Sequence, residues 1–374
     1  MKTKFLIAAI AASMLLSSCS KVGGEVPQST AVVQQEPVQP DTDNEEPVED
    51  ETNNEDTDGE NENSAEEAQD PVFQIDLSLK PNELGEVMIL MYHGIGDQES
   101  DWQRTPENFR KDLEYMYQNK YQMISLNDYA MGEISTRAGY TPIILTFDDG
   151  RQNNFNYIEE NGKLVIDPDC AVGILQEFRE KYPDFDVTAS FFLGTNIFGQ
   201  KEYEEEKLRF LVDNGYDIGN HTYSHNKLEL LESTEIQKEI GAVNNIINRL
   251  VPDYDVETLA LPHGSNPKDE YVSSMLEGQY ENIKYKMTAV LDVGWRPAFS
   301  PFDSMNNFKS LYRVTASETK VDNCGMYDYF SQFEENKRER FISDGNPNVV
   351  TIPKKHEEYL NMEMVGNRTV NIYE

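Results

Sequence analysis

Short apolar runs alternate with amphipathic helical patterns from about residue 87 onward, and this alternation limits the fold more than any other feature of the chain. The runs are continuously apolar, as in Ile143–Phe147, rather than apolar at every second position. Continuous apolar strands separated by helices are typical of a parallel sheet that is covered on both faces. We therefore expect an α/β fold with its functional residues at the carboxyl ends of the strands.

Local patterns set the bounds of each expected element. Thr105 and Pro106 supply an N-cap and a first-turn proline for one helix, and apolar residues fall on one face of another. The expected strands are Val87–Tyr92, Ile143–Phe147, Thr188–Leu193, Tyr216–Gly219, Leu259–Leu261, Thr288–Leu291 and Asn348–Pro353. The expected helices are Pro106–Tyr117, Ala171–Tyr182, Glu204–Asn214, Ser233–Leu250 and Tyr327–Arg340.

Charge divides the chain into parts. Residues 41–70 contain 15 acidic residues, no Lys or Arg and no aromatic side chain. Such a segment buries too little apolar surface to offset the entropy of ordering it, so we expect residues 20–80 to form a disordered acidic tether. A folded domain at 81–350 and a C-terminal tail at 351–374 complete the expected organisation. The net charge of −36 repels phosphate backbones, which excludes nucleic acid as an expected partner.

Residues 1–19 have the outline of a secretory signal peptide, with two lysines before an apolar core and small residues before Cys19. Leu16–Cys19 also resembles a bacterial lipobox. This resemblance implies that Cys19 is lipidated and anchors the exported domain to a bacterial membrane, at the cell envelope. The alternative is an ordinary cleaved signal with an incidental cysteine. The sequence leaves open whether the remaining pair, Cys170 and Cys324, forms a disulfide.

Two adjacent carboxylates follow the apolar strand Ile143–Phe147. Side chains alternate along a strand, so Asp148 and Asp149 are expected to point in opposite directions and can do different jobs. Gly150 permits a tight turn directly after them. The competing interpretation is that one of the two caps a helix or a turn.

Two histidines follow another strand end. His221 and His225 are four residues apart, a spacing that on a helical turn places both imidazoles within reach of one metal ion. A carboxylate from elsewhere would complete a two-histidine, one-carboxylate site with open positions. Non-haem iron oxygenases use the same ligand set, so this class of enzyme is an alternative. Capping or surface histidines are the structural alternative.

Together these motifs resemble those of the polysaccharide deacetylases, the NodB-homology family of carbohydrate esterases. Thr146–Gly150 is similar to the first motif of that family, His221–His225 to the second and Leu261–Gly264 to the third. The resemblance covers roughly residues 85–320. It implies a distorted (β/α)7 barrel, in which helices surround a closed parallel sheet.

The resemblance also implies a role for each residue of the motifs. Asp148 would be the catalytic base. A divalent metal, usually Zn²⁺ with Co²⁺ or another divalent ion as an alternative, would be the cofactor. Its implied ligands are Asp149, His221 and His225.

Three departures from the family pattern are visible in the sequence. The arginine of the third motif is replaced by Leu261, and Arg296 or Arg313 are candidates to fill its place. The fourth motif offers only Asp292 and Trp295. The C-terminal motif that supplies a catalytic histidine is missing.

Met91–Gly94 offers a replacement for that histidine. It resembles the early Tyr-His motif of a deacetylase subgroup with a permuted order of motifs, to which exported poly-N-acetylglucosamine deacetylases belong. The resemblance implies that His93 is the catalytic acid. A core or loop histidine is the alternative interpretation.

The function implied by these features is hydrolysis of carbon–nitrogen bonds other than peptide bonds. The substrate and partner would be an N-acetylated polysaccharide of the cell envelope or the extracellular space, bound near Pro262, Gly264 and Trp295, with Trp102 as a further aromatic at the groove. Two alternatives stay open: a glycan-binding lipoprotein with a degenerate site, and an O-acetyl esterase that acts on xylan-type polymers. The sequence does not indicate which glycan or linkage is cleaved, nor the oligomeric state.

Overall fold

The computed structural model describes residues 74–319 and 321–374. The expected signal peptide at 1–19, with Cys19, and the expected tether at 20–80 as far as residue 73 lie outside the described residues. The remaining part of that segment contains a short 3-10 helix, Leu77–Leu79. None of the helices within 74–319 and 321–374 is long and apolar enough to cross a membrane.

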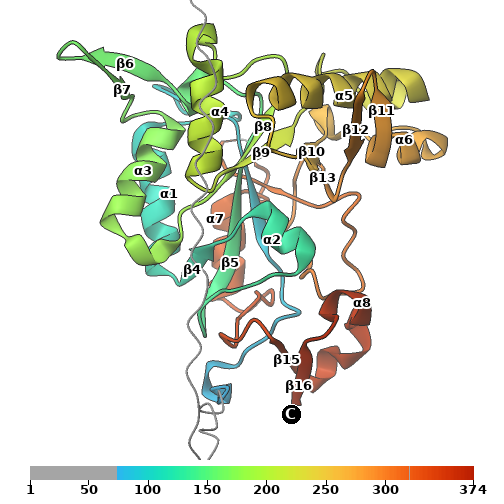
Figure 1. The fold of residues 1–374 in the computed structure, drawn as a ribbon. Helices are drawn as coiled ribbons and strands as arrows, with labels where there is room; N and C mark the ends of the chain where they lie inside the picture. The colour runs from blue at the N-terminus through green and yellow to red at the C-terminus, as the bar shows by residue number, and fades with distance from the viewer. Residues whose placement is uncertain (1–73, 320) are drawn as a thin grey trace, which may run out of the picture. The chain divides into compact units, whose positions relative to one another are not determined.

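One parallel sheet forms the centre of the structure (Figure 1). Its strands lie in the order β13-β10-β9-β8-β5-β1-β14, and β4 is added beside the start of β5. Every pairing within this sheet is parallel, as the sequence predicts. The strands are β1 (Met88–Tyr92), β4 (Tyr121–Met123), β5 (Thr141–Phe147), β8 (Ser190–Leu193), β9 (Asp217–Asn220), β10 (Thr258–Ala260), β13 (Ala289–Leu291) and β14 (Val314–Thr315).

The sheet curls until its two edges are joined by one segment of chain. Val314 of β14 pairs with Leu90 of β1. Just before β14, Leu311 pairs in parallel with Leu291 of β13, at the opposite edge. Without the branch β4, the eight-stranded sheet leaves seven strands in this ring. The structure therefore shows the distorted (β/α) barrel that the resemblance implied.

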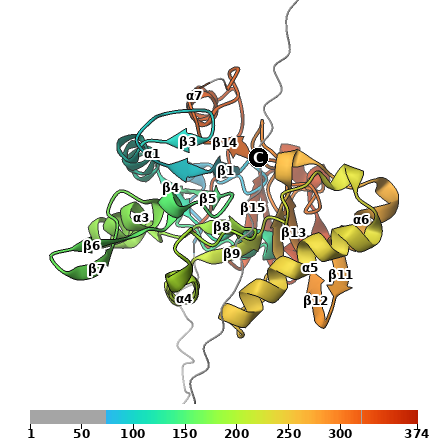
Figure 2. The same ribbon diagram turned by 90° about the horizontal axis from the view of Figure 1, so that it is seen from above.

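Helices lie around the sheet, as the view from above shows (Figure 2). The hydroxyl group of Thr105 accepts a hydrogen bond from the backbone N–H of Asn108 at 3.2 Å, so the N-cap expected from the sequence is present. The longest described helix, α5, buries Ile236, Ile240 and Val243 on one face. The helices are α1 (Pro106–Gln118), α2 (Leu126–Met131), α3 (Ala171–Lys181), α4 (Glu204–Asp213), α5 (Ser233–Leu250), α6 (Val272–Leu276), α7 (Met326–Glu334) and α8 (Met362–Val365).

Residues that alternate along the strands pack in two different apolar clusters. Ile89 and Ile144 lie in a cluster with Leu291, which comes from the far side of the sheet. Their neighbours Leu90 and Leu145 pack with residues of the surrounding helices. Every strand residue of β5 is buried, because both faces of the sheet are covered. This alternation fixes which side chains face the interior where the strands end.

The last residues of the chain pack onto the barrel and do not form a tail. β15 (Val349–Pro353) pairs in parallel with β16 (Thr369–Tyr373), and Val350 and Ile352 are buried. The boundary expected between residues 350 and 351 therefore falls inside a strand. Glu83, which precedes β1, accepts a hydrogen bond from the backbone N–H of Thr351 at 2.8 Å. Apolar burial and this bond tie the two ends of the domain together.

Several elements were not expected from the sequence, and one was expected to be longer. The expected helix Tyr327–Arg340 is α7, which ends at Glu334. The sequence left open whether Cys170 and Cys324 form a disulfide; in the structure both are free thiols. The unexpected strands are β4, β14, β16, β2 (Gly94–Ile95), β3 (Gln103–Arg104), and the antiparallel hairpins β6 (Tyr157–Glu160) with β7 (Lys163–Ile166) and β11 (Glu277–Tyr280) with β12 (Ile283–Lys286).

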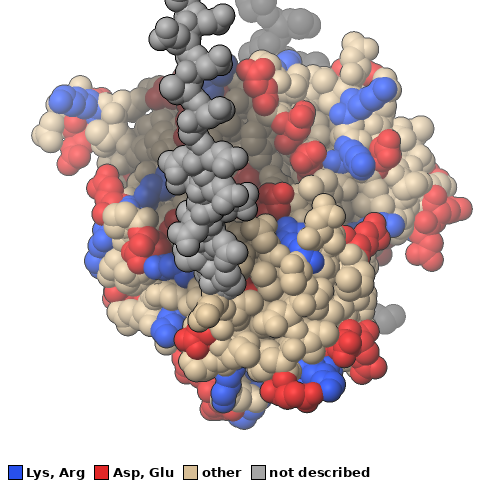
Figure 3. All heavy atoms as spheres, turned by 60° about the horizontal axis from the view of Figure 1, so that its bottom comes forward, with Lys and Arg blue, Asp and Glu red and all other residues tan. Residues whose placement is uncertain are grey.

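Many surface charges of the domain are paired. Arg110, for example, contacts Asp169 and Glu177, each at 2.9 Å. On the face in Figure 3, acidic and basic residues lie side by side rather than in separate zones. Exposed pairs of this kind contribute little stability, about 0–1 kcal/mol each. The stability of the domain rests mainly on its apolar clusters.

Candidate metal centre

Three side chains from two strand ends meet at the carboxyl edge of the sheet. Asp149 follows β5, and His221 and His225 follow β9. The Nε2 atom of each histidine lies 3.5 Å from Oδ1 of Asp149. One ligand atom from each of the three residues lies within 4.8 Å of the other two. The structure thus brings together the three residues that the resemblance implied as metal ligands.

A backbone carbonyl group orients the buried ring of His221. Its Nδ1 atom lies 2.9 Å from the carbonyl oxygen of Ala260, the last residue of β10. A carbonyl oxygen can only accept, so Nδ1 carries the proton and Nε2 presents a lone pair toward Asp149. A metal-binding histidine is commonly oriented by such a bond from its other ring nitrogen.

The two histidines do not lie on a helical turn, which corrects the local geometry suggested by their spacing. Thr222 and His225 have left-handed backbone angles, with φ of 62° and 54°. Hydrogen bonds to Glu239 of α5 replace those of a helix. The backbone N–H of Tyr223 donates to the Glu239 carbonyl at 2.9 Å, and that of Ser224 donates to its carboxylate at 2.7 Å.

Asn220 supports the same loop from the end of β9. Its side-chain amide donates to the carbonyl oxygen of Ile240 at 2.9 Å and to Oδ1 of Asn244 at 2.7 Å. Its own oxygen accepts a hydrogen bond from the backbone N–H of Thr222 at 2.8 Å. Neither Asn220 nor Glu239 was expected from the sequence to support the site. The available signal was a glutamate on the apolar face of the expected helix Ser233–Leu250.

Arg151 gives the two oxygens of Asp149 different surroundings. It donates two hydrogen bonds to Oδ2, at 3.0 and 2.7 Å, whereas Oδ1 faces the histidines. Burial raises the pKa of Asp149, but the neighbouring His221 and His93 and the hydrogen bonds from Arg151 together lower it below its ordinary range. Asp149 also has a φ of 74°, a strained conformation that is common at functional sites.

Asp148 is buried on the other side of the strand end, toward the barrel interior. Arg313 donates to both of its carboxylate oxygens at 2.8 Å, and its Nε donates to the carbonyl oxygen of Asp292 at 2.8 Å. Burial raises the pKa of Asp148, but the charge and hydrogen bonds of Arg313, together with the neighbouring histidines, outweigh burial and the pKa falls to about 2. Arg313 therefore fills the place of the missing third-motif arginine. Arg296 does not, because it pairs with Glu86 at 2.9 Å.

His93 follows β1 beside the two aspartates. Burial lowers the pKa of His93 to about 4, against the opposing charges of Asp148 and Asp149. The ring is therefore neutral at neutral pH and must receive a proton before it can act as an acid. The exposed indole of Trp102 lies against it, with ring centres 4.7 Å apart.

The third-motif segment contacts the histidine pair. The ring of His263, between Pro262 and Gly264, lies 4.8 Å from the ring of His225. The Gly264 N–H donates to the carbonyl oxygen of Leu261 at 3.1 Å, so it is engaged within its own turn. Trp295 is 59% exposed, with its ring 5.9 Å from that of Tyr312.

The donor set fits a divalent cation. Two imidazole nitrogens and one carboxylate oxygen are the ligands that zinc and other first-row divalent ions accept. A cleft of about 280 Å³ opens over them, lined also by the segment from Gly194 to Asn196. Three protein ligands beside an open cleft leave positions for water and substrate.

The part of the chain that carries this site is similar in sequence to known proteins. The family model described as polysaccharide deacetylase matches residues 137–280, which include Asp148, Asp149, His221 and His225. A chitooligosaccharide deacetylase of Bradyrhizobium sp. (strain ANU 289) is 26% identical over 148 residues, which are 39% of this chain and 56% of that protein. A protein of Bacillus subtilis (strain 168), whose name includes the words polysaccharide deacetylase, is 22% identical over 174 residues, or 46% of this chain and 55% of its own length. The chain thus spans little more than half the length of these curated relatives.

Two solved structures are also similar. The deacetylase PplD of Streptococcus pyogenes, in complex with acetate, is 18% identical with a TM-score of 0.46, covering 64% of this chain and 96% of that one. IcaB from Ammonifex degensii is 15% identical with a TM-score of 0.45, covering 66% of this chain and 97% of that one. The match to the family model and the names of the curated relatives agree with the motifs found in the sequence. Residues 137–280, which carry both aspartates and both histidines of the cluster, therefore match the polysaccharide deacetylase family that the sequence motifs resemble.

Proposed function

We propose that this protein is a metal-dependent deacetylase that removes acetyl groups from an N-acetylated polysaccharide of the cell envelope or the extracellular space. One observation carries the proposal: the Asp149, His221 and His225 cluster lies next to a carboxylate, Asp148, that an arginine holds ionised. A ligand set and an adjacent base are the two parts that hydrolysis of an amide requires.

A divalent cation, Zn²⁺ above all, would be held by Asp149, His221 and His225, and when bound it supplies Lewis-acid activation of water and of the acetyl carbonyl. Asp148 accepts the proton of the attacking water, because the Arg313 pair keeps it ionised at neutral pH. The proton taken up by Asp148 would pass to the neutral His93, which donates it to the amine nitrogen as the carbon–nitrogen bond breaks. The products are acetate and a free amino sugar.

The substrate would lie across the strand ends and contact the exposed side chains of Trp102, beside His93, and Trp295, which follows β13. Trp102 and Trp295 are 46% and 59% exposed. Aromatic faces of this kind suit the apolar faces of sugar rings, while Pro262 and Gly264 would shape the floor beside His225. A lipidated Cys19 would hold the domain at a bacterial membrane, which gives it access to envelope glycans.

The reason for considering a glycan-binding protein without activity was that the third-motif arginine is missing from the sequence. Arg313 makes the corresponding contact with Asp148, so this reason no longer applies. An oxygenase has no need of a buried base beside its ligands, so the arginine-paired carboxylate favours hydrolysis. An O-acetyl esterase would use the same residues, so only the substrate that is cleaved distinguishes this alternative from the N-deacetylase.

The test is acetate release from a panel of N-acetylated glycans, with acetylated xylan included, after addition of Zn²⁺ or Co²⁺. We expect release from at least one N-acetylated polymer, loss of most turnover in Asp148→Asn with metal binding retained, and loss of metal binding in Asp149→Asn. His93→Ala should lower turnover with metal binding retained. Release from xylan alone would favour the esterase. No release from any polymer by the metal-loaded wild type would refute the proposal.

A further inference from the structure

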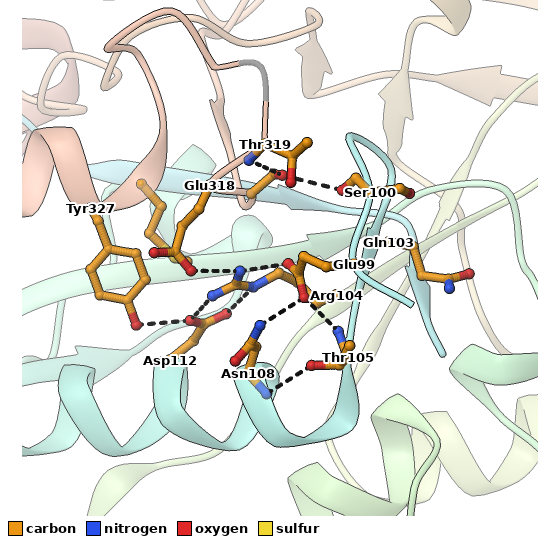
Figure 4. Close-up of polar contacts among 12 residues, drawn as sticks. Glu99, Ser100, Gln103, Arg104, Thr105, Asn108, Asp112, Glu318, Thr319 and Tyr327 are labelled. Carbon is orange, nitrogen blue, oxygen red and sulfur yellow. Dashed lines mark hydrogen bonds and ion pairs between the residues drawn. The ribbon is translucent and has the colours of Figure 1, made fainter. Parts of the chain in front are cut away.

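A buried guanidinium lies beneath the loop that carries Trp102 (Figure 4). Arg104 is 2% exposed and donates through Nε to Asp112 at 2.9 Å and through a terminal nitrogen at 2.5 Å. Asp112, on α1, is fully buried. A bidentate pair between two buried groups has one favoured geometry, so it fixes the end of the loop on the helix.

The same guanidinium reaches two further carboxylates. One terminal nitrogen donates to Glu99 at 2.6 Å and to Glu318 at 2.9 Å. Glu99 belongs to the loop itself and also accepts hydrogen bonds from the Thr105 N–H at 3.0 Å and from the Asn108 amide at 2.8 Å. Glu318 belongs to the segment after β14. Arg104 therefore joins its own loop and the nearby helix α1 to the segment after β14, which is 214 residues away in sequence.

This cluster connects directly to the strand that ends in His93. The hydroxyl group of Tyr92 donates to Asp112 at 3.2 Å, and the backbone carbonyl of Tyr92 accepts a hydrogen bond from the Asp148 N–H at 3.0 Å. His93 is the next residue along the chain. The cluster thus supports the backbone from which His93 projects and against which Asp148 is placed.

The loop held by Arg104 also covers His93. Trp102 stands two residues before Arg104, and its ring centre lies 4.7 Å from that of His93. The backbone carbonyl of Trp102 accepts a hydrogen bond from Arg151 at 3.2 Å, and Arg151 in turn binds Asp149. The loop is therefore fixed at Arg104 on one side and joined to the metal ligands on the other.

We propose that Arg104 is a positioning residue for the deacetylation reaction, which sets the place of His93 and holds Trp102 over it. This inference rests on the proposed function. Arg104 touches neither the cluster of metal ligands nor the substrate cleft in the described part of the chain; it acts through Asp112, Tyr92 and its own loop. A displacement of about 1 Å at a reacting group costs up to about 100-fold in rate, so a distant support can matter for turnover.

The first arm of the test measures kcat and KM for acetate release. Arg104→Gln should lower kcat roughly 10- to 100-fold with a much smaller change in KM, since the substrate cleft keeps its ligands. Arg104→Lys should restore part of the rate, because it keeps the charge but loses the bidentate geometry. Glu318→Gln removes one partly exposed contact and should lower kcat by only about threefold. This last variant keeps the test decisive if Arg104→Gln does not fold.

The second arm uses fluorescence, because Trp102 and Trp295 are the two tryptophans of the chain. In a Trp295→Phe background, Trp102 is the sole indole. We expect acrylamide to quench its emission more strongly when Arg104→Gln or Glu318→Gln is added. The matched control is Arg110→Gln on α1, the helix that carries Asp112, since Arg110 also bridges two carboxylates but pairs with neither Glu99 nor Glu318.

The kinetic arm and the fluorescence arm together distinguish failure of the proposed function from failure of the positioning role of Arg104. If wild-type protein releases no acetate, the proposed function fails, while quenching of Trp102 still decides whether Arg104 holds its loop. Folded Arg104 variants with wild-type kcat and wild-type quenching would overturn the inference. It would also be overturned if the Arg110→Gln control lost as much turnover as Arg104→Gln.

Discussion

Replacing Arg313 with methionine should destabilise the domain strongly at neutral pH. Arg313 is fully buried and its partner Asp148 is 2% exposed, so the variant leaves an unpaired carboxylate in the barrel interior. Removing one member of a buried ion pair costs about 3–5 kcal/mol. The pKa of Asp148 falls from 3.8 to about 2 despite burial, which corresponds to roughly 2–3 kcal/mol. The two figures agree in order of magnitude.

The sign of the pH dependence follows from the lowered pKa. A carboxyl group with a lowered folded-state pKa contributes stability above its ordinary pKa and loses it as pH falls through the folded value. The contribution of Asp148 is therefore complete at pH 7. We expect the Arg313→Met variant to lose about 3–5 kcal/mol there, or roughly 10 °C in Tm. Urea and thermal unfolding in the presence of a chelator measure this without a contribution from bound metal.

Two further variants make the measurement specific. Adding Asp148→Asn to Arg313→Met removes the unpaired charge and should recover most of the lost free energy of unfolding. Arg296→Met is the matched control, because Arg296 is 24% exposed and pairs with Glu86. This partly exposed pair should cost no more than about 1 kcal/mol. The reasoning fails if Arg313→Met loses no more stability than Arg296→Met.

Three other predictions test the supports of the site and the ends of the domain. Glu239→Ala should weaken Zn²⁺ binding about 10- to 100-fold in calorimetric titrations, because the loop that carries His225 loses its anchor on α5; unchanged affinity would contradict this. Burial and the charge of Asp344 raise the pKa of Glu83 to about 8, so ionisation of Glu83 costs stability as pH rises toward that value. Glu83→Gln should therefore raise Tm by a few degrees near pH 9 and change it little near pH 5, and an equal shift at both would refute the assignment. Gly294→Ala should lower Tm and turnover together, since a Cβ there would lie 1.7 Å from the backbone oxygen of Arg313.

The sequence predicts the strands and helices around the site well, because continuous apolar runs and capped helices are local patterns. The resemblance to the deacetylase motifs implies that Asp149, His221 and His225 lie together, and the strand ends that carry them do meet at one edge of the sheet. The conformation between the histidines could not be predicted. It depends on Glu239, which lies 15 residues from Ser224 and replaces the hydrogen bonds that a helical turn would have made.

Contacts between distant parts of the chain account for the other differences. Arg313 reaches Asp148 across 165 residues, and β14 beside it has only two residues, too few for a pattern. The sequence therefore offers two arginines without a reason to choose between them. The strand Asn348–Pro353 could be predicted from its local pattern. Its burial depends on partners near residue 83 and at β16, so the sequence did not show that this strand is part of the folded domain.

The chain enters the domain at the end of β1 that lies opposite the metal ligands. Residues 82–87 lead into the start of β1, whereas His93 and the aspartates stand where β1 and β5 finish, and all of these strands run in the same direction. The described chain thus enters the barrel at one pole and presents Asp149, His221 and His225 at the other. Under the proposed function, a polymer bound across the strand ends does not have to pass residues 82–87.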